Sequence, residues 1–186
     1  MSAGVTLFTI GHGARSLDDF LALLASAEVD SLIDVRARPA SRRHPHFERA
    51  ALTEALAEVG TAYVFEGRDL GGFRSPDTDS RHAALATDAL RGYADHMATV
   101  GFRAAADRVV ERATGTRVAL LCAERFPVDC HRNLLSDHLT RAGARVVHLI
   151  DSAIRHDHRL NPAARQEGEL LVYDAGRGRQ RTFGFD

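Results

Sequence analysis

The sequence predicts a single-domain α/β protein: a three-layer sandwich whose mainly parallel sheet of about five strands carries helices on both faces. Short apolar runs alternate with amphipathic segments along most of the chain, as in repeated strand–helix units. The length of 186 residues suits one domain with a substantial core. We expect this core to occupy residues 5–150, followed by a C-terminal extension at 151–186.

The first strand and helix are clearly patterned. Residues 5–10, VTLFTI, form a β-rich apolar run, so His12 should emerge at the carboxyl end of a buried strand. Ser16 is a good N-cap for a helix over 17–27, which has acidic residues in its first turn and a leucine-rich stripe. Residues 31–35, SLIDV, predict the second strand.

The middle of the chain supplies further units. Residues 48–59 place apolar side chains on one helical face and end at Gly60, a typical C-cap. Residues 61–65, TAYVF, predict the third strand, and the polar, turn-rich segment 75–90 reads as a surface excursion. The pattern that follows predicts two helices broken near Gly101.

The last core unit carries most of the chemistry. Residues 118–121 form a short apolar strand, a helix follows Asp129, and residues 145–150 predict the fifth strand. Beyond this point the pattern weakens, although 169–174 has the character of a short strand and the glycine- and arginine-rich 176–181 that of a mobile segment.

Composition narrows the classes of function. The net charge of −1 argues against a generally basic nucleic-acid binder, and no apolar run or basic leader predicts membrane insertion or export, so we expect a cytoplasmic protein. All 24 basic residues are arginine, which excludes lysine Schiff-base chemistry and a Walker A loop. Two cysteines without a secretory signal are typical of reduced, reactive or metal-binding thiols.

The loop between the fourth strand and its helix carries the candidate catalytic residues Cys122, Glu124, Cys130 and His131. A helix N-terminus stabilises anions and would depress the pKa of a nearby thiol, so either cysteine is a candidate nucleophile. A buried structural thiol and a metal ligand are the alternatives. The spacing C-x7-C-H matches no standard structural zinc pattern, so no metal ligand is assigned.

Arginines and glycines that follow other strands are candidates for substrate binding, since guanidinium groups suit phosphate and carboxylate oxygens. Asp34, next to the end of its strand, is placed to orient or neutralise one of these arginines. A Gly-Gly pair lets the backbone approach a ligand closely. The candidate binding residues are His12, Arg36, Arg38, Arg42, Gly71, Gly72, Arg74 and Arg132.

Several separated blocks resemble the DUF488 family of uncharacterised bacterial proteins. They are GHGARSLDDFLALL, SLIDVRARPASRRHPHF, LGGFR, RGYADHM and VALLCAERFPVDCHRNLL followed by VVHLI. The resemblance covers about residues 6–150 and implies a fold and site positions, but no reaction. Gly13 departs from the serine or threonine common after GH in the family. A looser similarity to rhodanese-like domains is an analogy only, because Glu124 and Pro127 interrupt the Cys-loop.

The strand ends therefore predict one rim where cations, thiols, an acid and imidazoles meet. We expect an enzyme that binds a small phosphorylated, nucleotide or sulfur-containing anion, with a cysteine thiolate as the candidate nucleophile. A metal-dependent enzyme with Cys and His ligands is one alternative. A non-catalytic nucleotide or nucleic-acid binder is the other, less favoured one. The sequence assigns no cofactor, reaction class or oligomeric state.

Overall fold

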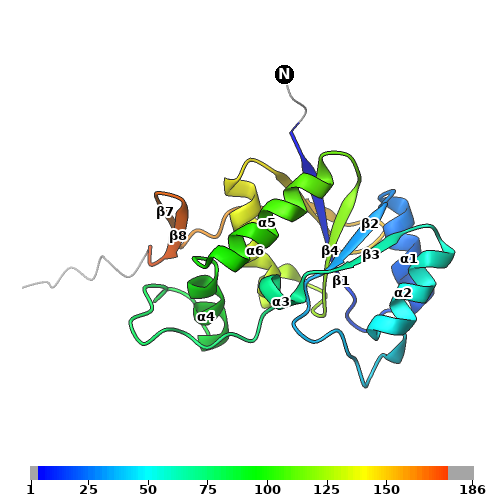
Figure 1. Cartoon of the computed structure of the whole chain (residues 1–186), viewed down its shortest axis with the longest axis horizontal. Helices are drawn as coiled ribbons and strands as arrows, with labels where there is room; N and C mark the ends of the chain where they lie inside the picture. Colours follow the sequence, from blue (N-terminus) through cyan, green and yellow to red (C-terminus); the bar gives the residue numbers. More distant parts are fainter. Residues whose placement is uncertain (1–3, 176–186) are drawn as a thin grey trace, which may run out of the picture.

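The computed structural model describes residues 4–175 and has the predicted α/β architecture (Figure 1). One sheet has the strand order β3-β2-β4-β1-β5-β6, in which only β6 runs antiparallel to its neighbour. Its strands are β1 (Thr6–Gly11), β2 (Ser31–Asp34), β3 (Ala62–Phe65), β4 (Val118–Cys122), β5 (Arg145–Leu149) and β6 (Arg155–Asp157). A separate hairpin pairs β7 (Ala164–Glu167) with β8 (Leu170–Tyr173).

Helices cover both faces of the sheet, as expected for parallel strands joined by crossovers. They are α1 (Leu17–Ser26), α2 (Arg49–Glu58), α3 (Gly67–Leu70), α4 (Asp88–His96), α5 (Val100–Ala113) and α6 (Arg132–Arg141), with 3-10 turns at Pro45–Phe47 and Pro127–Asp129. As predicted, Ser16 caps α1 by accepting a hydrogen bond from the Asp19 amide. Threonines Thr87 and Thr99 cap α4 and α5 in the same way. No described helix is both long and apolar enough to cross a bilayer.

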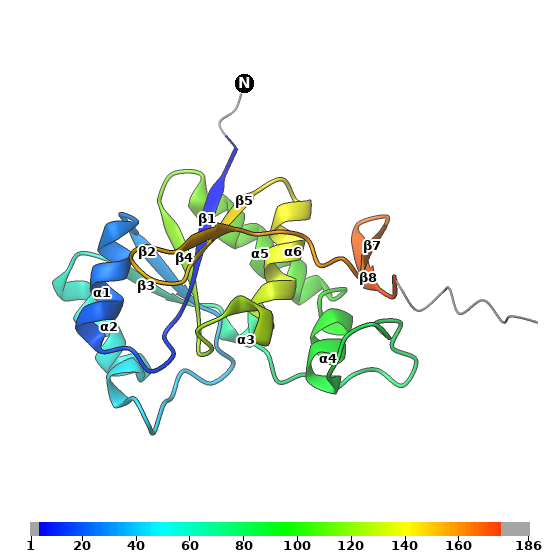
Figure 2. The ribbon, with the colours of Figure 1, turned by 180° about the vertical axis from the view of Figure 1, so that it is seen from behind.

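Two apolar cores lie on opposite faces of the sheet. The first packs α1 and α2 against it and contains Phe20, Leu24, Phe47, Leu52 and Leu56 with Ile10, Leu121 and Leu149. The second packs α4, α5 and α6 against the other face and contains Tyr93, Phe102, Val109, Leu134 and Leu139 with Leu7, Leu120 and Tyr173. Figures 1 and 2 show these helices on the two sides of the strands. The predicted three-layer sandwich is therefore confirmed.

The sheet has a topological switch point between β1 and β4. The chain leaves β1 through α1 on one face toward β2, whereas it leaves β4 through α6 on the other face toward β5. Connections that diverge to opposite faces leave a crevice at the carboxyl ends of the two strands, where ligands of open α/β proteins bind.

Three local predictions needed correction, and a fourth stays untested. The break between α4 and α5 lies at residues 97–99 rather than near Gly101, because the Thr99 side chain caps the Phe102 amide and starts the next helix before the glycine. The segment 75–90 is not wholly a surface excursion, because α4 begins at its end and Leu85 is buried. The extension adds β6 and β7 to the expected short strand at β8. The expected mobile segment 176–181 lies outside the described residues.

Candidate functional site

A pocket of about 660 Å³ opens at the switch point. Segments that follow four parallel strands line it, and the first residues of α4 close one side. Of the predicted site residues, the lining includes His12, Arg36, Arg38, Gly72, Cys122, Glu124, Cys130 and His131. Gly71, Arg42, Arg74 and Arg132 are not among the lining residues. The expected convergence of distant segments therefore holds for most of the set.

The two thiols, one carboxylate and one imidazole form a compact group, here called the Cys–His cluster: Cys122, Glu124, Cys130 and His131. The Sγ atoms of Cys122 and Cys130 lie 3.1 Å apart, and Cys122 Sγ lies 3.1 Å from Glu124 Oε2. His131 Nδ1 lies 3.8 Å from Cys122 Sγ and 3.9 Å from Cys130 Sγ. Both thiols are free and buried, whereas Glu124 is exposed.

Backbone contacts fix the orientation of His131. Its Nε2 lies 3.1 Å from the carbonyl oxygen of Val35 at the end of β2, so this nitrogen carries the proton and donates it. In the neutral ring Nδ1 therefore has a free lone pair, and this atom faces the two sulfurs. The buried ring of Tyr93 packs against the imidazole with centroids 4.8 Å apart. A Cβ on Gly72 would lie 2.9 Å from Nδ1, so only glycine leaves room there.

Gly11 positions the loop that carries Glu124. A Cβ at Gly11 would collide with the Glu124 carbonyl oxygen at 1.7 Å, so the end of β1 and the Cys-loop can touch only because this residue is glycine. The guanidinium of Arg132 then donates to the carbonyl oxygens of Glu124 and Arg125 at 3.1 and 3.3 Å. These contacts hold the loop against the sheet.

The pKa of the Cys122 thiol differs from the sequence-based expectation. The hydrogen bond with Cys130 and burial raise the pKa of Cys122 well above its ordinary value, opposite to the depressed thiol pKa that a helix N-terminus predicts. Partial burial opposes ionisation of Glu124, but hydrogen bonds from the Cys122 thiol and from its own amide lower its pKa overall. Burial lowers the pKa of His12 to about 4, so this ring is neutral at pH 7.

The predicted arginines have different roles in the structure. Arg36 is buried and lines the pocket, but its guanidinium donates to both Asp34 carboxylate oxygens at 2.6 to 3.1 Å and to the Phe47 carbonyl oxygen at 2.9 Å. Asp34 thus orients this arginine. Arg74 donates to two backbone carbonyl oxygens. Within residues 4–175, Arg38 is exposed, lines the pocket and has no ion-pair or hydrogen-bond partner.

Sequence reasoning missed three contributors to the site. Tyr93 was not among the predicted site residues, yet its ring packs against His131. Phe73 and Val128 line the pocket with exposed fractions of 83% and 69%. Phe73 has a φ of +60°, which is rare for a bulky side chain. The only sequence signal for Phe73 is its place after two glycines. Tyr93 and Val128 have no sequence signal for a role in the site.

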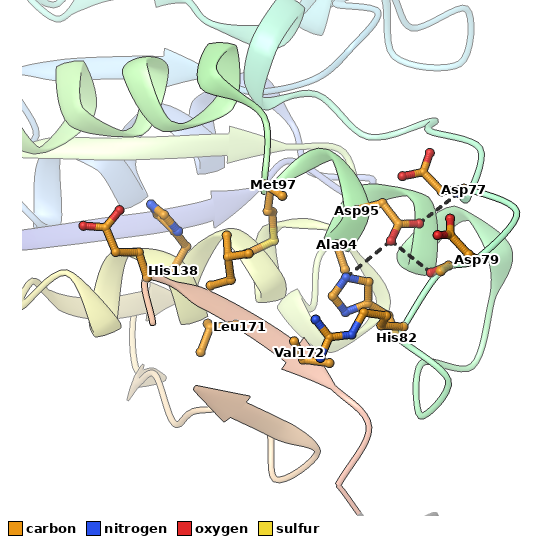
Figure 3. Close-up of a pocket in the computed structure, with 14 residues that line it drawn as sticks. Asp77, Asp79, His82, Ala94, Asp95, Met97, His138, Leu171 and Val172 are labelled. Atoms are coloured by element: carbon orange, nitrogen blue, oxygen red, sulfur yellow. Dashed lines mark hydrogen bonds and ion pairs between the residues drawn. The ribbon is translucent and has the colours of Figure 1, made fainter. Parts of the chain in front are cut away.

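A second cavity of about 200 Å³ lies between α4 and β8, and its polar groups satisfy one another (Figure 3). Asp95 accepts hydrogen bonds at 3.0 Å from the Asp77 amide and from the Ser80 hydroxyl. His82 lies 3.4 Å from Asp95 through Nε2 and accepts from the Tyr173 amide at 3.2 Å through Nδ1. The Tyr173–His82 bond therefore joins the extension to the core at this cavity, where His82 and Asp95 have structural partners.

The fold and the pocket define an α/β protein with a Cys–His cluster at its switch point. A family model described as "Domain of unknown function DUF488" matches residues 16–139. The chain belongs to this family. Neither the curated proteins nor the solved structures include a match. The matched range contains the whole Cys–His cluster and Arg38, whereas His12 lies just before it.

Proposed function

We propose that the protein is an enzyme that binds a small anionic substrate in the switch-point pocket and transforms it at the Cys–His cluster. One observation carries this proposal: Cys122, Glu124 and His131 meet within 3.1 to 3.8 Å in a pocket that is open to solvent. A thiol, an acid and a base in contact supply the nucleophile and the proton-transfer groups that group-transfer chemistry needs. Simple anion binding requires none of them.

The proposed anionic character of the substrate rests on charge and on backbone geometry. Arg38 lines the pocket with its guanidinium unpaired within the described residues. Cys130 and His131 precede α6 directly, so the positive end of that helix dipole lies at the cluster. Arg36 forms an ion pair with Asp34, so it shapes the pocket lining and does not bind the substrate anion. A phosphate, carboxylate or sulfur oxyanion suits these groups.

A non-catalytic nucleotide or nucleic-acid binder is the alternative. It accounts for Arg38 and for the exposed Arg42 and Arg43 on the same loop. It does not account for two thiols buried beside a carboxylate and an imidazole, since these groups add little to anion affinity. The two proposals differ in what the thiol and the carboxylate do after the ligand has bound.

The test separates binding from turnover. A panel of phosphate monoesters, nucleotides and small sulfur-containing anions is screened by calorimetry and by product analysis. Arg38→Ala should weaken binding about 10-fold or more, because a charge-assisted contact contributes about 1.5–3 kcal/mol. Cys122→Ser and Glu124→Gln should retain binding but lower turnover at least about 100-fold. Arg43→Ala, on the same loop but outside the lining, is the matched control.

Two results would contradict the proposal. If no anion of the panel binds, the substrate class is wrong. If an anion binds and is converted equally by wild type, Cys122→Ser and Glu124→Gln, the Cys–His cluster is not the reacting centre. Binding without any conversion by the wild-type protein would favour the non-catalytic alternative.

A further inference from the structure

We infer that Cys122, Cys130 and His131 are the protein ligands of one borderline-soft divalent metal ion, with zinc as the first candidate. The inference deepens the proposed function and rests on it for the role of the pocket as an active site. With the ion bound, Cys122 and His131 act as metal ligands in place of nucleophile and base. The metal site itself is tested without any substrate. Each residue offers one donor atom, and the three donor atoms all lie within 4.8 Å of one another.

The two S···N distances match a tetrahedral ion, whereas the S···S distance is shorter than such an ion requires. Zinc bonds of about 2.3 Å to sulfur and about 2.0–2.1 Å to nitrogen imply S···N separations of about 3.6 Å and an S···S separation of about 3.8 Å. The observed S···N distances are 3.8 and 3.9 Å. The sulfurs, at 3.1 Å, must move apart by about 0.7 Å, which a small side-chain rotation provides. The three donor atoms therefore lie close to the positions that the ion requires, and only the two sulfurs must separate.

Neighbouring groups hold these ligands as metal sites require. A ligating histidine normally donates its second ring N–H to a carbonyl or carboxylate, and His131 Nε2 donates to the Val35 carbonyl oxygen. The amide of Arg132 donates to Cys130 Sγ at 3.3 Å, a contact that stabilises a metal-bound thiolate. Gly72 leaves the Nδ1 side of the ring uncovered. The two hydrogen bonds come from the residue after β2 and from the first residue of α6, and they orient His131 and Cys130.

Three protein ligands leave a fourth position open to the pocket, as in catalytic rather than structural zinc sites. Binding replaces two S–H bonds with two sulfur–metal bonds and releases two protons to solvent, while the Nδ1 lone pair of His131 binds without loss of a proton. Glu124 is exposed beside Cys122 and would remain available as an acid–base group at the open position. An ion there would also attract the anionic substrate.

The experiment uses the full chain, reduced and stripped of metal with a chelator. Zinc is titrated in competition with a chromophoric chelator, and cobalt(II) then reports the coordination by its absorption spectrum. We expect one equivalent of zinc and cobalt bands typical of sulfur ligation in a four-coordinate site. Cys122→Ser, Cys130→Ser and His131→Gln should each weaken zinc binding at least about 100-fold. His12→Gln, in the same pocket but outside the ligand set, should leave the stoichiometry unchanged.

Folding of each variant is checked by its urea unfolding midpoint, so that a lost site is distinguished from a lost fold. The inference is overturned if the folded wild type binds no equivalent of zinc, or if the cysteine variants bind it as well as wild type. Anion binding that still depends on Arg38 in those cases would preserve the proposed function without the metal.

Discussion

The Cys–His cluster and a second group of buried polar side chains use histidines in opposite ways. The second group, here called the His–Asp chain, consists of Thr9, His148, His158, Asp137 and Tyr173. It joins β1, β5 and α6 to the C-terminal extension. Both groups contain imidazoles with defined tautomers, but only the Cys–His cluster, with its exposed Glu124, opens into the large pocket.

Every nitrogen of the His–Asp chain has a partner of the right kind. Asp137 accepts from His158 Nε2 at 2.8 Å, so His158 Nδ1 is the acceptor for His148 Nε2 at 2.9 Å. His148 Nδ1 in turn accepts from the Thr9 hydroxyl at 2.7 Å. Tyr173 donates to the other oxygen of Asp137 at 3.0 Å. With one ring proton on each histidine, every ring nitrogen of His148 and His158 has a hydrogen-bond partner.

In the Cys–His cluster one hydrogen-bond acceptor, His131 Nδ1, has no well-placed donor among the described residues. His131 Nδ1 has two sulfur atoms at 3.8 and 3.9 Å, distances at the limit of a hydrogen bond, and no closer donor among the described residues. A buried polar group that is fully paired stabilises the fold, whereas converging donor atoms without a matched partner indicate a ligand. Under the proposed function, this difference separates the structural role of the His–Asp chain from the functional role of the Cys–His cluster.

The largest expected effect is a loss of stability when the His–Asp chain is broken. Asp137→Ala leaves the buried donors of His158, Tyr173 and the Asn161 amide unpaired, so the free energy of unfolding should fall by about 3 kcal/mol or more. Cys122→Ser, a nearly isosteric change in the other group, should cost less than about 1.5 kcal/mol. Urea unfolding measures both, and equal losses would remove the distinction.

Acid should destabilise the protein through its buried histidines. Burial lowers the pKa of His148 to about 3 and those of His12 and His138 to about 4. The unfolded chain therefore binds more protons below about pH 6.5, so stability is fully present above this value and falls as the pH decreases toward 4. Urea unfolding between pH 7.5 and 5 should show this decline.

His148→Gln should reduce that pH dependence by up to about 1.4 kcal/mol per pH unit, apart from any loss at neutral pH. The exposed His156, which faces His148 across β5 and β6, is the matched control, and His156→Gln should leave the slope unchanged. If His148→Gln leaves the slope unchanged as well, the ring of His148 does not remain neutral in the folded state.

The sequence predicted the sheet, its main helices and the segments that meet at the pocket, because hydrophobic period and strand ends are local signals. It also placed the two cysteines, Glu124 and His131 at this pocket. It also expected Asp34 to orient or neutralise an arginine, as Asp34 does for Arg36, but it did not single out Arg36 as the partner. It did not predict that Tyr93 supports His131. The choice of Arg36 among the neighbouring arginines depends on side-chain directions, and the contact of Tyr93 with His131 joins distant segments, so the sequence pattern does not encode either one. The raised pKa of Cys122 has the same origin, since it depends on the neighbouring Cys130.

The smallest expected change in stability tests how the Cys–His cluster is held. Gly72→Ala adds a methyl group 2.9 Å from His131 Nδ1 and should displace the ring, weakening zinc binding about 10-fold while lowering the free energy of unfolding by about 1 kcal/mol. Gly115→Ala, where an added Cβ meets no atom within 4 Å, is the matched control for both measurements. Unchanged zinc affinity in Gly72→Ala would mean that close packing at Nδ1 does not position His131. A large loss of stability instead would place Gly72 with the His–Asp chain, as a structural element that the pocket merely adjoins.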